Sequence, residues 1–285
     1  MNILLTGGAG FIGSNLAKKL VDLKHKVTCI DNYSTGSRLN HVEGVEYFDL
    51  DTRHIASLRI VSPDIIFHLG EYSRVEQSFA DFDHVWDYNV HGTKEVLKYA
   101  RAHRARLIYA GSSTKFGDNG SNSSPYAWSK ANNTEFVKNY SNWYGLNYAI
   151  TYFYNAYGPN EIQTGPYATL IAKFLELYHQ NKEFQITSPG TQLRNFTHVS
   201  DIVSGLILVA GSGVGDGYGI GHPDSYSIIE VAEMFNHPYK LTPEKTGNRM
   251  TASVVTDKVR ELGWVPRVNL PDYIDEMTEI VRIKS

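Results

Sequence analysis

Three glycines near the N-terminus constrain the fold more than any other feature of the sequence. Gly7, Gly10 and Gly13 follow the apolar run Asn2–Thr6 and open a segment of helical periodicity, Phe11–Asp22. A strand that turns directly into a helix needs residues without a Cβ where the turn is tight and where the helix packs on the strand. The N-terminus of such a helix offers amides and a partial positive charge to a pyrophosphate. The spacing therefore predicts a dinucleotide site lined by Gly7, Gly10, Phe11, Ile12 and Gly13.

An acidic residue ends the next predicted strand, Lys26–Asp31. Asp31 follows the glycines by about 20 positions, where its carboxylate can bind the ribose hydroxyls of a dinucleotide. A carboxylate there would repel a 2′-phosphate, so the expected cofactor is NAD rather than NADP. Asp49, at the end of the third predicted strand, has two open interpretations: an acceptor for the adenine amino group, or a solvated carboxylate.

Short β-rich runs alternate with helical patterns through the first two-thirds of the chain. Several runs are apolar on both faces, as strands between two helical layers are. The alternation predicts an α/β fold with a doubly wound parallel sheet of the Rossmann type. Strands are expected at Asn2–Thr6, Lys26–Asp31, Val45–Asp49, Asp64–Leu69, Arg106–Ser112 and Asn147–Tyr154, and helices at Phe11–Asp22, Asp83–His103 and Pro125–Tyr144.

Proline and glycine become frequent after Gly158, and the pattern becomes mixed. We expect residues 1–158 to form the NAD-binding domain, with later segments returning to it. Residues 159–285 are expected to form mainly a smaller lobe for the substrate, with helices near Tyr167–Asn181 and Ser227–Phe235.

A tyrosine and a lysine stand four residues apart in the segment SPYAWSK. Tyr126 and Lys130 would share one face of a helix that begins at Pro125. A tyrosine hydroxyl has an ordinary pKa near ~10, but a nearby ammonium and the positive ring of oxidised NAD favour the phenolate. The pair suits removal of a hydroxyl proton while hydride leaves the same carbon, and Ser112 at the end of a predicted strand could share that proton. In isolation, the same spacing also fits an ordinary amphipathic helix.

Composition excludes several classes of protein. The formal charge of -3 offers no basic surface for nucleic acid, and Cys29 alone cannot form an internal disulfide. The histidines show no spacing of metal ligands, so no metal is expected. No apolar stretch approaches the length of a bilayer span, and Asn2–Thr6 lacks the layout of a secretion signal, so we expect a cytoplasmic protein.

Together these motifs resemble the extended short-chain dehydrogenase/reductase family, in particular its nucleotide-sugar epimerases and dehydratases. The resemblance runs nearly from end to end, through motifs that appear in the same order. They are Thr6–Gly13 (TGGAGFIG), Asp31-Asn32, His68–Gly70, Asn89–Thr93, Ser112–Gly117, Ser124–Lys130, Asn155–Pro159, Arg194–Val199 and Leu262–Trp264.

The resemblance implies a role for individual residues. Ser112, Tyr126 and Lys130 would form the catalytic group, and Asn155 and Arg194 would hold the diphosphate of the nucleotide. A guanidinium suits phosphate oxygens, although a surface salt bridge is the alternative for Arg194. The residues implied around NAD are Asp31, Asn32, Asp49, Leu50, Leu69, Asn89, Tyr126, Lys130 and Tyr154.

The residues after Ser112 favour one reaction within the family. Related dehydratases and decarboxylases carry acids there, whereas this chain has Ser113 and Thr114. The resemblance therefore implies a 4-epimerase acting on UDP-glucose and UDP-galactose or their N-acetylhexosamine forms. A dehydratase, a reductase, or an enzyme for a GDP- or dTDP-sugar stays open. A non-catalytic NAD sensor is disfavoured, because a sensor needs no activated base.

Several positions depart from the family pattern. Lys245 or Arg249 would supply a second cation for phosphate, and Ala252 lies where related epimerases vary residue size against the substituent at C2. Gly70-Glu71-Tyr72 replaces the usual pair of alanines and leaves contacts beside the nicotinamide open. By the same resemblance we expect a homodimer, packed through helices near His84–His103 and Pro125–Tyr144.

Overall fold

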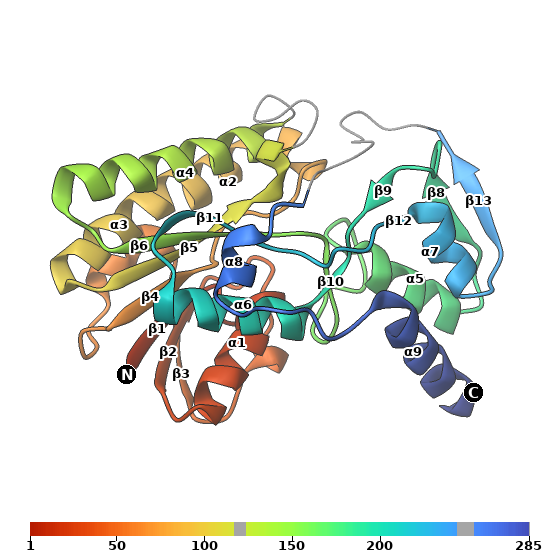
Figure 1. Ribbon diagram of the computed structural model, residues 1–285, viewed down its shortest axis with the longest axis horizontal. Coiled ribbons are helices and arrows are strands. Elements are labelled where there is room, and N and C mark those ends of the chain that lie inside the picture. The colour runs from red at the N-terminus through yellow and green to blue at the C-terminus, as the bar shows by residue number, and fades with distance from the viewer. Residues whose placement is uncertain (117–123, 244–253, 285) are drawn as a thin grey trace.

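The computed structural model describes residues 1–116, 124–243 and 254–284. A parallel sheet forms the centre of a larger lobe, and a smaller lobe lies to its right in Figure 1. The strand order is β11-β6-β5-β4-β1-β2-β3, and neighbouring strands all run parallel. The predicted doubly wound α/β fold is confirmed. The strands are β1 (Asn2–Thr6), β2 (Lys26–Asp31), β3 (Val45–Asp49), β4 (Ile65–His68), β5 (Arg106–Ser112), β6 (Tyr148–Phe153) and β11 (Gly215–Ile220).

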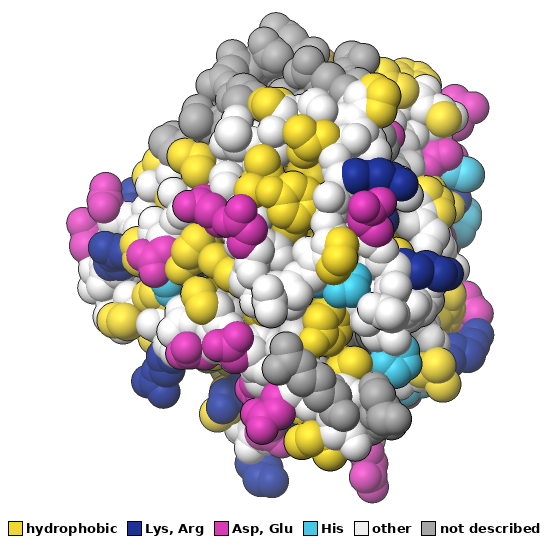
Figure 2. Space-filling view, turned by 90° about the vertical axis from the view of Figure 1, so that its right-hand side faces the viewer, with side chains coloured by type: hydrophobic (Ala, Val, Ile, Leu, Met, Phe, Trp, Pro, Cys, Tyr) yellow, Lys and Arg dark blue, Asp and Glu magenta, His cyan; other side chains and the backbone are white. Residues whose placement is uncertain are grey.

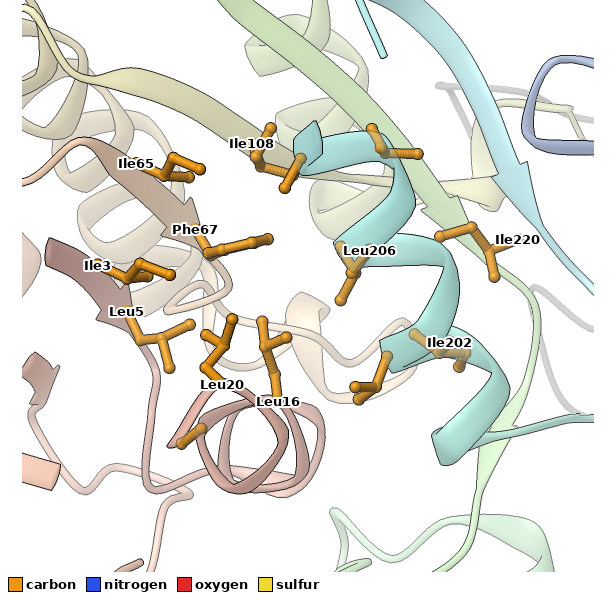
Figure 3. Close-up of a cluster of buried hydrophobic side chains, with 14 of the residues drawn as sticks. Ile3, Leu5, Leu16, Leu20, Ile65, Phe67, Ile108, Ile202, Leu206 and Ile220 are labelled. Carbon is orange, nitrogen blue, oxygen red and sulfur yellow. The ribbon is translucent and has the colours of Figure 1, made fainter. Parts of the chain in front are cut away.

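Successive residues of the central strands enter two different hydrophobic layers. Ile3 and Leu5 of β1 pack on one side, and Figure 3 shows them facing Leu16 and Leu20 of the first helix. Leu4, between them in the chain, packs on the opposite side. Because helices cover both faces, these strands are apolar at successive positions. The covering helices are α1 (Phe11–Asp22) and α6 (Val199–Ser212) on one face, and α3 (Gly92–His103) and α4 (Pro125–Tyr144) on the other.

The helix predicted over Asp83–His103 contains a segment of wider turns. The chain passes from α2 (Phe82–Val85) through a π-helix, η4 (Trp86–His91), into α3. Asn133 of α4 donates a hydrogen bond from Nδ2 to the carbonyl oxygen of Asn89 at 2.8 Å. A side chain from another element that engages the helical carbonyls favours such a bulge, and helical periodicity alone does not reveal it.

The smaller lobe has an apolar core of its own. The rings of Phe174 and Phe184 stack with centroids 4.3 Å apart, and Phe235 packs edge-on against both. Figure 2 views this side of the molecule and shows acidic, basic and hydrophobic side chains interspersed. The elements outside the central sheet and its covering helices include β7 (Ala156–Tyr157), α5 (Leu170–His179), β8 (Phe184–Thr187), β9 (Leu193–Arg194), β10 (Thr197–His198), β12 (Tyr226–Ser227), α7 (Ile228–Met234), β13 (Tyr239–Thr242), α8 (Asp257–Glu261) and α9 (Leu270–Lys284).

Four short 3₁₀ helices complete the described secondary structure: η1 (Arg38–Asn40), η2 (Thr52–Ser57), η3 (Gln77–Phe79) and η5 (Ser113–Phe116). Within the described residues, no helix has both the length and the apolar character needed to cross a bilayer.

Candidate active site

A cavity of about 840 Å³ lies where the carboxyl ends of the sheet strands meet the smaller lobe. Gly7, Asp31 and Ser112 line it from the ends of β1, β2 and β5. Ile186 and Arg194 line it from the smaller lobe. In open α/β sheets this edge is where ligands bind, so the cavity is the candidate active site.

The glycine turn forms the dinucleotide end of this cavity. Gly7 has a positive φ of 73°, and a Cβ on it would lie 2.8 Å from the backbone of Gly70. A Cβ on Gly13 would lie 2.0 Å from the carbonyl oxygen of Gly7, so any side chain there would separate α1 from β1. Gly10 caps α1 without a side-chain hydrogen bond, which leaves the amides of the first turn available to an anion. The turn therefore fits a dinucleotide pyrophosphate.

Asp31 lies beside that turn, whereas Asp49 lies outside the cavity. The carboxylate of Asp31 accepts hydrogen bonds from the backbone N–H of Ala9 at 2.9 Å and of Tyr33 at 2.8 Å. Burial raises the pKa of Asp31, and these two donors oppose the rise. Asp49 instead pairs with Arg38 at 2.7 Å, with its side chain 62% exposed. The structure thus shows an exposed, paired carboxylate, and the contact of Asp49 with the adenine amino group stays a prediction.

The hydroxyl groups of the predicted catalytic segment come together on the cavity wall. Tyr126, in the first turn of α4, donates from its hydroxyl to Oγ of Ser112 at 3.1 Å. Ser112 also shares a hydrogen bond of 2.9 Å with the hydroxyl of Thr114. The helix is fixed at this point because Ser124 caps it, accepting from the N–H of Ala127 at 3.1 Å. A phenol and a serine hydroxyl in contact can pass a proton between them and a bound hydroxyl.

Lys130 follows Tyr126 by one helical turn, and its ammonium is held in the protein interior. Nζ forms an ion pair with the carboxylate of Glu71 and donates to the carbonyl oxygen of Ala110. The two paired side chains are 6% and 4% exposed. Burial, the largest single influence, would raise the pKa of Glu71, but the charge of Lys130 and the hydrogen bonds from Lys130 and Thr93 act together to hold that pKa below its ordinary value.

Other predicted residues divide between the cavity wall and the interior. Asn155 and Arg194 line the cavity; Asn155 donates to the carbonyl of Asn195 at 3.0 Å. Asn89 and Tyr154 are buried and do not line it. Asn89 instead binds the backbone of Tyr72 and the hydroxyl of Ser129. The further predicted residues on the wall are Gly10, Phe11, Ile12, Gly13, Asn32, Leu50, Leu69 and Lys130. Lys245, Arg249 and Ala252 lie outside the described residues.

Sequence reasoning assigned no role to several charged residues of the cavity wall, among them Glu71 and Arg74. In the sequence, Glu71 was notable only because it replaces an alanine of the family pattern. No residue near it in the sequence indicated that it pairs with Lys130. Arg74 also lines the cavity and donates from Nε and Nη2 to the carbonyl oxygen of Tyr167. Both follow β4, at the same sheet edge as Ser112, and that position is the sequence signal that they share.

Comparison with known proteins identifies the class of protein. Residues 3–221 match the model of the NAD dependent epimerase/dehydratase family. The chain therefore belongs to this family, and NAD, the cofactor predicted from Asp31, is the cofactor of the family.

Similar proteins differ in the reactions that their names state. UDP-glucuronic acid decarboxylase 6 of Arabidopsis thaliana is 30% identical over 100% of this chain and 90% of its own length. A putative UDP-glucose 4-epimerase of Methanocaldococcus jannaschii is 27% identical over 95% of both chains. The structure of UDP-glucose 4-epimerase from Thermotoga maritima with UDP-glucose has a TM-score of 0.90, at 25% identity over 100% of this chain and 99% of that one. These similarities establish the family and leave the individual reaction to the site.

Proposed function

We propose that the chain interconverts the 4-epimers of a nucleotide-activated hexose, UDP-glucose and UDP-galactose or their N-acetylhexosamine forms. The observation that carries this proposal is the chain of hydroxyls from Tyr126 through Ser112 to Thr114. The acids that serve elimination or decarboxylation in related enzymes are replaced here by Ser113 and Thr114. What remains is a proton-transfer group, and epimerisation requires nothing more from the protein's side chains.

The proposed reaction is a reversible oxidation at one carbon. Tyr126 takes the proton of the C4 hydroxyl as the C4–H bond breaks, and a 4-keto sugar forms. NAD, when bound, accepts the hydride from C4 and gives it back. The 4-keto sugar rotates within the cavity before the hydride returns, so the hydride adds to the opposite face of C4. Tyr126 then returns the proton to the oxygen on C4. Protons and electrons balance, and no cofactor is consumed.

The diphosphate of the substrate is assigned to the side of the cavity next to the smaller lobe. Asn155 and Arg194 lie on that wall, and a guanidinium matches phosphate oxygens in two-point contact. Lys245, Arg249 and Ala252 complete the proposed substrate set, as their positions in the family pattern imply. UDP is the favoured nucleotide because both epimerase relatives are named for UDP-glucose. Residues 159–285 are thus proposed to form mainly the lobe that binds the nucleotide sugar.

The direct test is product analysis by NMR after incubation with a panel of nucleotide sugars. With UDP-glucose or UDP-N-acetylglucosamine we expect the 4-epimer to accumulate to equilibrium with no net change in NADH absorbance. Release of a 4-keto-6-deoxy sugar would identify a dehydratase. Loss of CO₂ from a UDP-hexuronic acid would identify a decarboxylase, and steady consumption of NADH would identify a reductase.

A homodimer is proposed through α2, η4 and α4. These neighbouring helical segments expose Phe82, Trp86 and Trp128 at 51%, 38% and 41%, and the two tryptophan rings stack with centroids 5.6 Å apart. Large apolar side chains grouped on a surface are typical of an interface. We expect Trp128→Glu to convert the dimer into a monomer, measured by light scattering after size-exclusion chromatography. As the matched control, Trp143→Glu changes an exposed tryptophan near the far end of α4. A dimer unaffected by Trp128→Glu would place the interface elsewhere.

A further inference from the structure

Glu71 is a buried carboxylate whose two oxygens are both engaged. Oε1 accepts hydrogen bonds from Thr93 at 2.7 Å, Asn133 at 2.8 Å and the hydroxyl of Tyr109 at 3.2 Å. Oε2 accepts a hydrogen bond from the ammonium of Lys130. Three elements, α3, α4 and β5, thus fix one carboxylate in one orientation. So many donors around a single group indicate a site built for a negative charge.

A neutral histidine, His68, contacts this carboxylate indirectly, through the hydroxyl of Thr93. Nε2 of His68 lies 2.9 Å from the hydroxyl of Thr93, and Nδ1 lies 2.7 Å from the hydroxyl of Thr6. Burial lowers the pKa of His68 to about 4, so the ring is uncharged at neutral pH. If Thr93 donates to Glu71, it must accept from His68, which assigns the ring proton to Nε2. Lys130 and Glu71 are then the opposite charges of this cluster, and they offset each other.

We propose that Glu71 is a positioning residue of the active site, which anchors Lys130 and offsets its charge so that Tyr126 ionises less readily than beside an unpaired lysine. This inference rests on the proposed function, because it takes Tyr126 as the proton-transfer group. An ammonium has three N–H donors. Glu71 and Ala110 occupy two of them, which fixes the direction in which the third can serve a ligand.

Offsetting the charge of Lys130 suits a reaction in which one residue transfers a proton in both directions. Tyr126 must take a proton and later return it, and such a group works best when neither of its forms is strongly favoured. An uncompensated ammonium would favour the phenolate and slow the return of the proton. Other titratable groups that interact with Lys130 or Tyr126 include His68 from β4, Arg74 from the loop after it, and Tyr109 from β5.

The test separates the charge of Glu71 from its size. Glu71→Gln keeps the size and removes the charge, Glu71→Ala removes both, and Glu71→Asp keeps the charge. For NAD-loaded protein without substrate, the ultraviolet absorbance of tyrosinate is followed against pH. Each variant is measured as its difference from the same variant carrying Tyr126→Phe, which isolates one tyrosine from the 19 in the chain. We expect Gln and Ala to move the Tyr126 transition to lower pH by about one unit, and Asp to leave it near its original position.

Two results would overturn the proposal. A transition that stays in place in both Gln and Ala would show that the carboxylate exerts no field on Tyr126. A transition that moves to higher pH would show that Glu71 only keeps Lys130 within reach of the phenol. The titration needs no sugar, so it also decides the role of Glu71 if the substrate assignment is wrong. With an active substrate, the acidic limb of the kcat profile should move in step with the absorbance.

Discussion

Replacing Tyr126 with phenylalanine is expected to lower kcat for the interconversion of 4-epimers by about 10²–10⁴-fold. The substitution removes the hydroxyl that donates to Ser112 and keeps the ring of residue 126 in the first turn of α4. Ser112 and the rest of the cavity wall remain, so KM and the affinity for NAD should change far less than kcat. The measurement is initial rates by NMR, together with calorimetric titration of NAD.

Tyr144→Phe is the matched control for this experiment. Tyr144 ends the same helix and is 48% exposed, outside the cavity wall. Its variant should retain the rate of the unmodified protein. If Tyr126→Phe also retained a rate within a few-fold, the base would have to be another group, and the assignment of the reaction to this part of the cavity would be wrong.

Replacing Lys130 with methionine is expected to lower the free energy of unfolding by about 3–5 kcal/mol, because it leaves the carboxylate of Glu71 buried without a counter-charge. The two side chains are only 6% and 4% exposed, so water does not screen the loss. The folded-state pKa of Glu71 lies below its ordinary value. The pair therefore stabilises the fold above that ordinary value, and the stabilisation is lost as the pH falls through the lowered pKa.

The double variant Lys130→Met/Glu71→Gln distinguishes a buried ion pair from two unrelated residues. Removing both charges should restore part of the stability, with a coupling free energy of about 1–3 kcal/mol. Urea unfolding with and without saturating NAD separates this effect from a loss of cofactor binding. Strictly additive losses would mean that the two charges do not stabilise each other in solution. The exposed pair Lys138–Glu135 on the same helix is the control, for which we expect coupling below about 1 kcal/mol.

Local sequence patterns were sufficient where one physical requirement acts on neighbouring residues. Gly7 needs its positive φ and Gly13 has no room for a Cβ, and both demands come from one turn. Apolar residues on both faces of β1 and β4 reflect two covering layers. Because such requirements act on neighbouring residues, the predicted bounds of six elements match those observed: β1, β2, β3, β5, α1 and α4.

Contacts between distant segments were beyond such reasoning. No local pattern indicated that the side chain of Asn89, predicted to lie at the cofactor site, binds Tyr72 and Ser129 in the interior. The π-helix around it accompanies a hydrogen bond from Asn133, 44 residues further along the chain. Arg38 and Asp49 form an exposed pair at the edge of the sheet, which no local pattern indicates.

The sequence by itself determined the glycine turn, the two covering layers, the cofactor and the pair of Tyr126 and Lys130. Each of these features depends on residues that lie close together in the chain. Only the tertiary structure decided which charge stands beside the lysine. Glu71 lies 59 residues before Lys130. The two meet only because α4, which carries Lys130, packs over the sheet next to the segment that follows β4. The pKa and the energy of a buried charge depend on its distance from the nearest opposite charge. The linear sequence does not give that distance.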